Sequence, residues 1–299
     1  MKILAARRYP GPAFEELREV EVLPLAELDG PRSDVEGLIV ANEPVPLDLL
    51  PSLRVVANYS VGYDRIDVEA CTARGIVVTN TPGVLDDATA DLAFALILAT
   101  RRQVVEGDRL VRSGGWGRSW SDGWVAEDAA GSTLGIVGLG RIGSAVARRA
   151  RGFDLRVLYT RRHPVDTELA EFRELDELLA EAHLVTVHVP LTPETRGLID
   201  ARRLALLPDG ACFVNTARGE IVDEPALVAE LVSGRIRAGL DVFANEPNVP
   251  PELLDLPNVV LTPHLGSATR QAREAMTRMV VDNLLAVERG DPPLTPVRP

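Results

Sequence analysis

The chain has 299 residues, of which 46% are hydrophobic and 25% are charged, and its formal net charge is −12. Because a domain usually holds ~100–200 residues, this length suggests two domains. The acidic balance excludes a protein that binds nucleic acid through its overall charge, because phosphate contacts require a basic face. A small anion could still be held by a few arginines and backbone N–H groups.

Two isolated cysteines, Cys71 and Cys212, lie outside any CxxC pattern. Such thiols are typical of reduced core residues in a cytoplasmic protein, so neither a disulfide nor a metal site is expected. The first residues become charged at Arg7 and Arg8, which is too soon for a secretory signal. The longest apolar run, residues 92–99, is far shorter than the ~20 residues that span a bilayer. We therefore expect a cytoplasmic protein with no membrane segment.

Short β-rich runs alternate with helical patterns through the first part of the chain, which indicates a parallel α/β arrangement. The expected strands are residues 3–6, 37–40, 54–58 and 76–79. The expected helices are residues 14–20 and 67–74. Together they predict one small α/β unit that ends near residue 83.

A long Ala- and Leu-rich helix is expected over residues 86–111, followed by an irregular loop rich in Gly and Trp. A second α/β series then begins. Its expected strands are residues 134–137, 155–159, 184–189, 211–215, 238–242 and 259–262. Helices are expected to open at Thr192-Pro193 and at Asp223, and an amphipathic helix is expected over residues 267–289. The last residues, which are rich in proline, predict an extended tail.

Residues 138–143 read Gly-Leu-Gly-Arg-Ile-Gly, a GxGxxG pattern that directly follows an apolar strand and opens a helical run. Glycines allow the tight turn and the close approach of backbone to a pyrophosphate, which then lies at the helix N-terminus. The alternative is a strand, turn and helix with packing glycines and no ligand. The context favours a dinucleotide site that includes Gly138, Gly140, Arg141, Ile142 and Gly143.

The strand after this helix ends at Thr160-Arg161-Arg162, about 20 residues beyond the first glycine, where the ribose-reading residue is expected. An NAD site usually has a carboxylate there, whereas this chain has a threonine and two arginines. Two positive charges suit a 2′-phosphate, so NADPH is expected to be preferred and NADH to be possible. The alternative is that the two arginines form a solvated surface.

Three ionisable residues, Arg218, Glu246 and His264, follow expected strands of the same sheet. Ligands of open α/β sheets bind beyond the carboxyl ends of the strands, so the three are expected to converge there. A histidine can give a proton to a carbonyl oxygen that accepts a hydride, and a carboxylate beside it favours the imidazolium. An arginine can hold a carboxylate and a carbonyl oxygen with its planar fork.

Each of these residues also has a plainer interpretation. Arg218 could pair with Glu220 or Glu224 at the surface, Glu246 could be an ordinary loop acid, and His264 could be a hydrogen-bonded structural histidine. The joint presence of the three behind a dinucleotide pattern favours the catalytic interpretation.

Several segments in this order resemble the D-isomer-specific 2-hydroxyacid dehydrogenases over nearly the whole chain. The segments that carry the resemblance are residues 60–64, 138–143, 215–223, 239–247 and 262–267. Within that family, residues 86–93, 111–114 and 159–161 look most like glyoxylate/hydroxypyruvate reductases.

The resemblance implies two doubly wound parallel-sheet domains. A Rossmann-type NAD(P)-binding domain over residues 84–267 is inserted in a smaller, flavodoxin-like substrate-binding domain formed by residues 1–83 and 268–299. It also implies a homodimer in which the loop at residues 116–124 lies near the dimer contact, with Trp124 favoured over Trp120 as a residue that reaches the partner's active site.

The resemblance also implies roles for single residues. Arg218, Glu246 and His264 match the catalytic trio, with His264 as the acid/base. The substrate is expected to contact Ser60, Val61, Gly62 and Arg218, with the N–H groups of Val61 and Gly62 gripping its carboxylate. Besides the glycine turn and residues 160–162, the residues expected at the cofactor are Thr89, His188, Val189, Pro190, Thr216, Ala217, Asp241, His264 and Gly266.

Two residues depart from the pattern of glyoxylate reductases. Asn42 stands where an apolar pocket residue is expected, and Arg65 stands where Asn or His is more familiar. The first leaves the size and polarity of the substrate open. Arg65 could favour a second acidic group on the substrate, but a position facing solvent is the preferred interpretation.

We therefore predict an oxidoreductase that reduces glyoxylate or hydroxypyruvate to the D-2-hydroxy acid with NADPH. One alternative is a dehydrogenase for another 2-hydroxy acid, such as 3-phosphoglycerate. The other is a non-catalytic binding protein that senses a dinucleotide.

Overall fold

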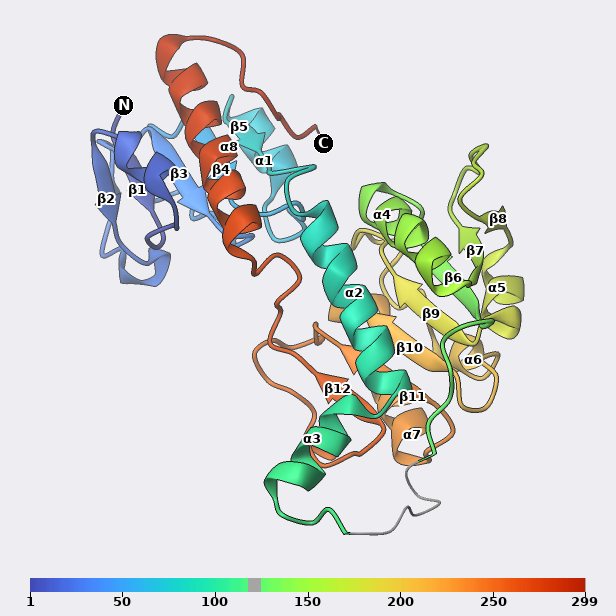
Figure 1. The fold of residues 1–299 in the computed structure, drawn as a ribbon. Helices are drawn as coiled ribbons and strands as arrows, with labels where there is room; N and C mark the ends of the chain where they lie inside the picture. The colour runs from blue at the N-terminus through green and yellow to red at the C-terminus, as the bar shows by residue number, and fades with distance from the viewer. Residues whose placement is uncertain (118–124, 299) are drawn as a thin grey trace. The chain divides into compact units, whose positions relative to one another are not determined.

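The computed structural model describes residues 1–117 and 125–298, and it divides into two compact units. The first unit is formed by Met1–Leu85 together with Ser267–Pro299, and the second by Asp86–Gly266. Figure 1 traces both units from the amino terminus to the carboxyl terminus.

The first unit is built on a five-stranded sheet of parallel strands in the order β2-β1-β3-β4-β5. The strands are β1 (Ile3–Ala5), β2 (Val20–Val22), β3 (Gly37–Val40), β4 (Val55–Asn58) and β5 (Val77–Thr79). The order 2-1-3-4-5 is the flavodoxin-like one. The central strands β3 and β4 are buried along their whole length, as expected for a parallel sheet covered on both faces.

Two α-helices, each with a capping side chain, pack in this unit. Asp67 caps α1 (Val68–Ala73) by accepting from the N–H of Ala70, and Thr269 caps α8 (Arg270–Arg289) in the same way. The long helix α8 packs against β4 and against the short 3₁₀-helix η1 (Pro12–Glu16). The proline-rich tail then returns to the sheet, where the Val297 N–H donates to the Val78 carbonyl at 2.8 Å.

The second unit is built on a seven-stranded parallel sheet in the order β12-β11-β10-β9-β6-β7-β8. The strands are β6 (Thr133–Val137), β7 (Arg156–Thr160), β8 (Glu171–Phe172), β9 (Leu184–Val187), β10 (Cys212–Asn215), β11 (Arg237–Leu240) and β12 (Val259–Leu261). This is the Rossmann order with one further strand, and the order reverses between β6 and β9. The predicted fold class, two α/β units with parallel sheets, is confirmed.

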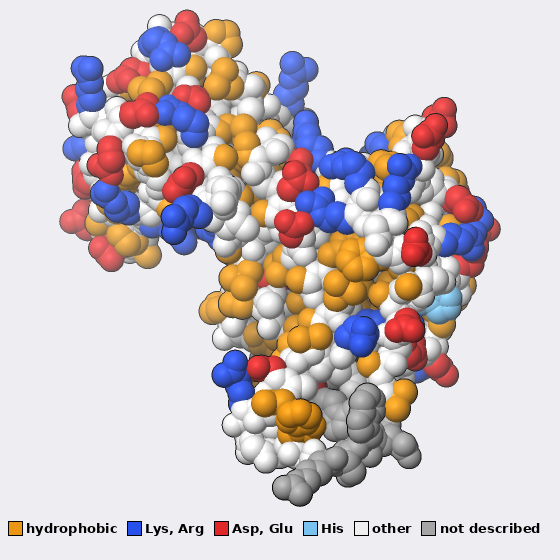
Figure 2. Space-filling view, in the orientation of Figure 1, with side chains coloured by type: hydrophobic (Ala, Val, Ile, Leu, Met, Phe, Trp, Pro, Cys, Tyr) orange, Lys and Arg blue, Asp and Glu red, His pale blue; other side chains and the backbone are white. Residues whose placement is uncertain are grey.

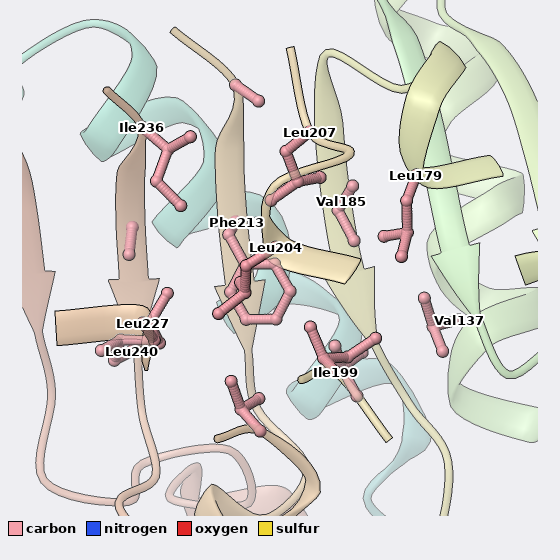
Figure 3. Close-up of a cluster of buried hydrophobic side chains, with 14 of the residues drawn as sticks. Val137, Leu179, Val185, Ile199, Leu204, Leu207, Phe213, Leu227, Ile236 and Leu240 are labelled. Atoms are coloured by element: carbon pink, nitrogen blue, oxygen red, sulfur yellow. The ribbon is translucent and has the colours of Figure 1, made fainter. Parts of the chain in front are cut away.

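Helices cover both faces of the larger sheet. On one face lie α2 (Asp86–Arg101) and α4 (Arg141–Ala150), which share a core with the sheet (Figure 1). On the other lie α5 (Leu175–Glu181), α6 (Ala201–Leu204) and α7 (Glu224–Val232). Figure 3 shows Leu179, Leu204 and Leu227 from these helices in one cluster with the sheet, where Leu204 lies beside Phe213 of β10 and Leu227 beside Leu240. Each such side chain stabilises the fold by roughly 1.5–3 kcal/mol.

The helix predicted over residues 14–20 is wrong. The chain makes only the single turn η1 there and then enters β2, which pairs with β1 through Ile3 and Val20. Pairing with the edge of β1 satisfies backbone groups that a short helix would leave to water, so tertiary structure overrides local pattern.

Two further helix predictions need correction. The helix expected over 86–111 is two helices, α2 and α3 (Val104–Arg112), because Gln103 has a left-handed φ of 53°. No helix opens at Thr192-Pro193; a single turn forms there and stops at Gly197, whose φ is 63°. The next helix, α6, is capped by Asp200 instead. The described residues include no helix long and apolar enough to cross a membrane.

Candidate active site

The glycine turn after β6 brings two strand ends and a helix into close contact. Gly138 has a φ of 103°, and a Cβ on it would lie 2.9 Å from the backbone of His188. A Cβ on Gly143 would lie 2.2 Å from the Gly138 carbonyl oxygen. These two positions therefore require glycine for packing and backbone conformation. A Cβ on Gly140 would meet only open space, so this residue leaves room for a ligand at the start of α4.

The residues at this helix N-terminus fit a dinucleotide. Gly140 is the N-cap of α4 and offers no capping side chain, which leaves the first N–H groups to an anion. Arg141 is exposed and Ile142 half-buried on the first turn. Across the sheet, the Thr216 hydroxyl is buried and has no hydrogen-bond partner among the described residues. A buried polar atom of this kind usually has a partner, and a bound ligand would supply one.

Two guanidinium groups lie beside the glycine turn. Thr160 is buried at the end of β7, whereas Arg161 and Arg162 are exposed. The Arg161 side chain donates to the Leu139 carbonyl at 3.4 Å. The Arg162 guanidinium lies 4.0 Å from the Glu194 carboxylate. Positive charge from Arg161 therefore lies next to the glycine turn, and the acidic side chain of Glu194 lies near Arg162.

His188, Val189 and Pro190 follow β9, at the point where the strand order reverses. The His188 N–H donates to the Val137 carbonyl at 2.8 Å, which joins the ends of β6 and β9. The His188 ring is 2.9 Å from the Thr186 hydroxyl, and burial lowers the pKa of this imidazole to about 3. At neutral pH His188 is therefore uncharged and can serve as a wall or a hydrogen-bonding group, but not as an acid.

The turn after β10 is shaped by the buried side chain of Asn215, which the sequence interpretation passed over. Its oxygen accepts from the Ala217 N–H at 3.0 Å, and its amide donates to the Arg218 carbonyl at 2.8 Å. Gly219 then packs directly on the backbone of Phe243. This contact carries Arg218 toward the segment that holds Glu246. The sequence signal for this role was an Asn at the end of an expected strand, directly before the turn that holds Arg218.

His264 and Glu246 form a hydrogen-bonded pair. The His264 Nδ1 lies 2.9 Å from the Glu246 Oε2, with the histidine side chain 46% exposed and the glutamate 28%. Burial acts to raise the pKa of Glu246, but hydrogen bonds from His264 and the Phe243 N–H, with the charge of Arg218, hold it below its usual value. The carboxylate is therefore ionised at neutral pH and oriented toward the imidazole.

The loop that carries His264 is fixed by the fully buried carboxylate of Asp241. It accepts from the Thr262 hydroxyl at 2.6 Å and from the N–H groups of Leu265 and Gly266 at 2.6 and 2.9 Å. Burial raises the pKa of Asp241 despite these bonds. His264 itself has a φ of 54°, which is uncommon outside glycine and is often found at functional positions.

Thr89, on α2, meets the same loop. Its hydroxyl donates to the Gly266 carbonyl at 3.2 Å, and a Cβ on Gly266 would lie 3.5 Å from both the Asp241 carboxylate and Thr89. These residues therefore form one cluster with the loop that carries His264.

In the first unit, Ser60, Val61 and Gly62 form the half-buried loop after β4. Asn42, with a φ of 56°, donates its backbone N–H to the Asn58 side chain at 2.8 Å and accepts from the Arg65 N–H at 3.0 Å. Asn42 is thus engaged in the structure of this loop. The Arg65 residue is exposed.

Trp120 and Trp124 lie outside the described residues. Within residues 1–117 and 125–298, no group of three or more His, Cys, Asp or Glu side chains could hold a metal ion.

Comparisons with known proteins point to one family. Residues 94–266 match the model of the D-isomer specific 2-hydroxyacid dehydrogenase NAD binding domain. A glyoxylate reductase of Pyrococcus horikoshii is 56% identical over 82% of this chain and 76% of its own, and that of Pyrococcus furiosus is 51% identical over 94% and 87%. The NADPH-dependent glyoxylate/hydroxypyruvate reductase of Sinorhizobium meliloti, solved with NADP and malonate, is 38% identical, with a TM-score of 0.90 over 99% of this chain and 96% of that one.

Proposed function

The chain belongs to the D-isomer-specific 2-hydroxyacid dehydrogenase family of NAD(P)-dependent oxidoreductases, and from this we propose that it reduces glyoxylate or hydroxypyruvate with NADPH. The product is the corresponding D-2-hydroxy acid. The observation that carries the proposal is the contact of 2.9 Å between His264 and Glu246 beyond the carboxyl ends of the strands.

His264 is the proton donor of the proposed reaction. Its Nδ1 is engaged by Glu246, so the proton that goes to the substrate's carbonyl oxygen leaves from Nε2. The ionised Glu246 orients the ring and stabilises the imidazolium. His188 cannot take this role, because burial keeps its ring neutral at physiological pH.

Arg218 holds the carbonyl oxygen and the carboxylate of the substrate through its planar guanidinium. The N–H groups of Val61 and Gly62, with Ser60 beside them, bind the carboxylate. A carboxylate that accepts several N–H bonds is fixed in orientation, which favours a reactive geometry.

The unit formed by Asp86–Gly266 holds the cofactor. Gly138, Gly140 and Gly143, with the first turn of α4, bind the pyrophosphate. The remaining parts of the cofactor are bound by three groups of residues: Thr216 and Ala217, residues 188–190, and the cluster of Thr89, Asp241 and Gly266. When bound, a nicotinamide cofactor supplies the hydride that adds to the keto carbon.

NADPH is preferred over NADH in this proposal because of the charges after β7. Arg161 and Arg162 offer two guanidinium groups, and residues 160–162 contain no carboxylate to accept a bond from a ribose hydroxyl. Glu194 lies 4.0 Å from Arg162 and opposes this preference in part, since it competes with a phosphate for the same guanidinium.

The proposal is tested by steady-state kinetics with NADPH and NADH against glyoxylate, hydroxypyruvate, pyruvate, 3-phosphohydroxypyruvate and larger 2-oxo acids. The highest kcat/KM is expected with NADPH and glyoxylate or hydroxypyruvate. A preference for the phosphorylated acid would favour the alternative substrate class. Tight NADPH binding without turnover of any 2-oxo acid would favour a dinucleotide sensor.

We also propose that the protein is a homodimer. Helix α3 buries none of its residues within the chain, and Val104, Val111, Trp116 and Val125 are each more than half exposed. Figure 2 shows hydrophobic side chains gathered at the foot of the view, beside the grey residues. A second copy would cover this surface, and light scattering should give a mass near twice that of the chain. Replacing Val104 and Val111 by Ser is expected to shift that mass toward the monomer.

A further inference from the structure

We propose that Asn58 and Asn80 are positioning residues that build the carboxylate-binding loop of the first unit. Their side-chain amides hold the carbonyl oxygens of three consecutive residues on one side of the loop, and this directs the N–H groups to the other side. The inference rests on the proposed function, because it assigns to this loop the carboxylate of a 2-oxo acid.

The contacts are all within the first unit. The Asn58 amide donates to the Gly62 carbonyl at 2.8 Å and to the Ser60 carbonyl at 3.3 Å. The Asn80 amide donates to the Val61 carbonyl at 2.9 Å. The carbonyl of Ser60 also accepts from the N–H of Thr81 at 3.0 Å. Asn58 is the last residue of β4, and Asn80 directly follows the neighbouring strand β5.

The direction of the N–H groups follows from peptide geometry. In a planar trans peptide, the C=O of one residue and the N–H of the next point in opposite directions. The carbonyls of Ser60, Val61 and Gly62 point toward the two amides, so the N–H groups of Val61, Gly62 and Tyr63 point away from them. Among the described residues, none of these three N–H groups has a hydrogen-bond acceptor. Successive N–H groups on one side of a turn form an anion-binding concavity.

The amides are themselves held in place. Asn58 is fully buried, and its side-chain oxygen accepts the Asn42 N–H at 2.8 Å, which fixes which way the amide faces. The backbone of Asn80 is bonded on both sides to Thr295: its N–H donates at 3.2 Å, and its carbonyl accepts from the Thr295 hydroxyl at 2.6 Å. The loop is therefore preorganised, and a carboxylate does not have to order it on binding.

Isosteric variants test this arrangement. Asn58→Asp keeps the oxygen that accepts from Asn42 but replaces the donor to Ser60 and Gly62 with an oxygen that repels their carbonyls. Asn80→Asp does the same to Val61 at a half-buried position, where folding is less at risk. Asn258→Asp is the matched control: Asn258 is half-buried just before β12, and its amide donates to the Leu231 and Ile236 carbonyls, each at 2.9 Å, instead of the loop.

Three readouts separate a positioning role from a merely structural one: KM and kcat for glyoxylate, the Kd of oxalate for the NADPH complex by calorimetry, and the Kd of NADPH. Both loop variants are expected to raise KM and the oxalate Kd by about tenfold or more, because hydrogen bonds to a charged group are weakened. Their kcat and NADPH affinity should stay close to those of the wild type. Asn258→Asp should lower the melting temperature and leave KM and the oxalate Kd unchanged.

The inference is overturned if the folded loop variants bind oxalate as tightly as Asn258→Asp does, or if the wild-type protein does not bind oxalate at all. A protein that turns over no 2-oxo acid but binds oxalate in an Asn58-dependent manner would refute the proposed function and support the inference. Turnover of glyoxylate with a KM that the loop variants do not change would support the proposed function and refute the inference.

Discussion

Gly219 is the point at which the turn carrying Arg218 packs on the segment carrying Glu246, and Gly219→Ala should separate the two. A Cβ at this position would lie 2.0 Å from the Phe243 carbonyl carbon and 2.2 Å from the Ala244 nitrogen. Both neighbours are backbone atoms, which cannot rotate away as a side chain can. Real contacts of a Cβ are no closer than 3.0 Å, so the two segments must move apart by at least about 1 Å.

This displacement has two expected consequences. Overpacking of a buried site costs roughly 1–3 kcal/mol of folding free energy. A misplacement of about 1 Å in a catalytic constellation costs on the order of 10²-fold in rate, so kcat/KM for glyoxylate should fall by about that factor. The affinity for NADPH should change less, because the glycine turn at 138–143 packs on the ends of β6 and β9 and not on Gly219.

The assay compares Gly219→Ala with Gly152→Ala in urea unfolding, NADPH binding and steady-state kinetics below the unfolding transition. Gly152 is a matched control, since a Cβ there meets nothing within 4 Å and its φ is not in the left-handed region. Gly219→Ala with the same unfolding midpoint and the same kcat/KM as the control would refute the packing argument.

The remaining predictions concern the proton donor, the cofactor and pH. His264→Gln should lower kcat by about 10²–10⁴-fold while NADPH still binds, and an unchanged kcat would remove His264 from the mechanism. Replacing Arg161 and Arg162 together by Ala should raise the KM for NADPH far more than that for NADH; equal losses would contradict a phosphate site. Glu194→Gln should lower the KM for NADPH alone, an effect that should fade at high salt. The pKa of His188 is lowered to about 3, so above that value and up to about 6.5 the unfolded chain binds a proton that the native protein does not. Stability should therefore rise with pH in this window, by at most about 1.4 kcal/mol per unit, and His188→Gln should flatten this slope in urea titrations.

Several features were predictable because they depend on residues close together in the chain. Gly138 and Gly143 contact each other within a single turn, so their spacing alone indicated the strand, turn and helix. Asp223 begins α7 as predicted because a cap is a contact over three residues. The alternation of strands and helices likewise predicted two parallel sheets. For the glycine turn and the helix cap, the physical cause is a contact between residues a few positions apart, so it lies within the sequence pattern itself.

Other local signals were misleading because partners distant in the chain competed with them. Thr192-Pro193 has the composition of a helix start, yet the chain makes only one turn before Gly197, whose N–H donates to the distant Glu220 carbonyl at 2.9 Å. Residues 20–22 belong to a strand because the edge of β1 was available to pair with them.

In the candidate site, too, local residue patterns were predictable and long-range distances were not. The residue types and their order suggested Arg218, Glu246 and His264 as candidates. Only folding set the separation of 2.9 Å between Glu246 and His264 and lowered the pKa of the Glu246 carboxylate below its usual value. Only folding, too, placed Gly219 against Phe243 and turned the amides of Asn58 and Asn80 toward one loop. Residue types and short spacings are written in the sequence. Distances between residues far apart in it depend on which strands pair and in what register, and that is settled by burial and hydrogen bonding across the whole fold.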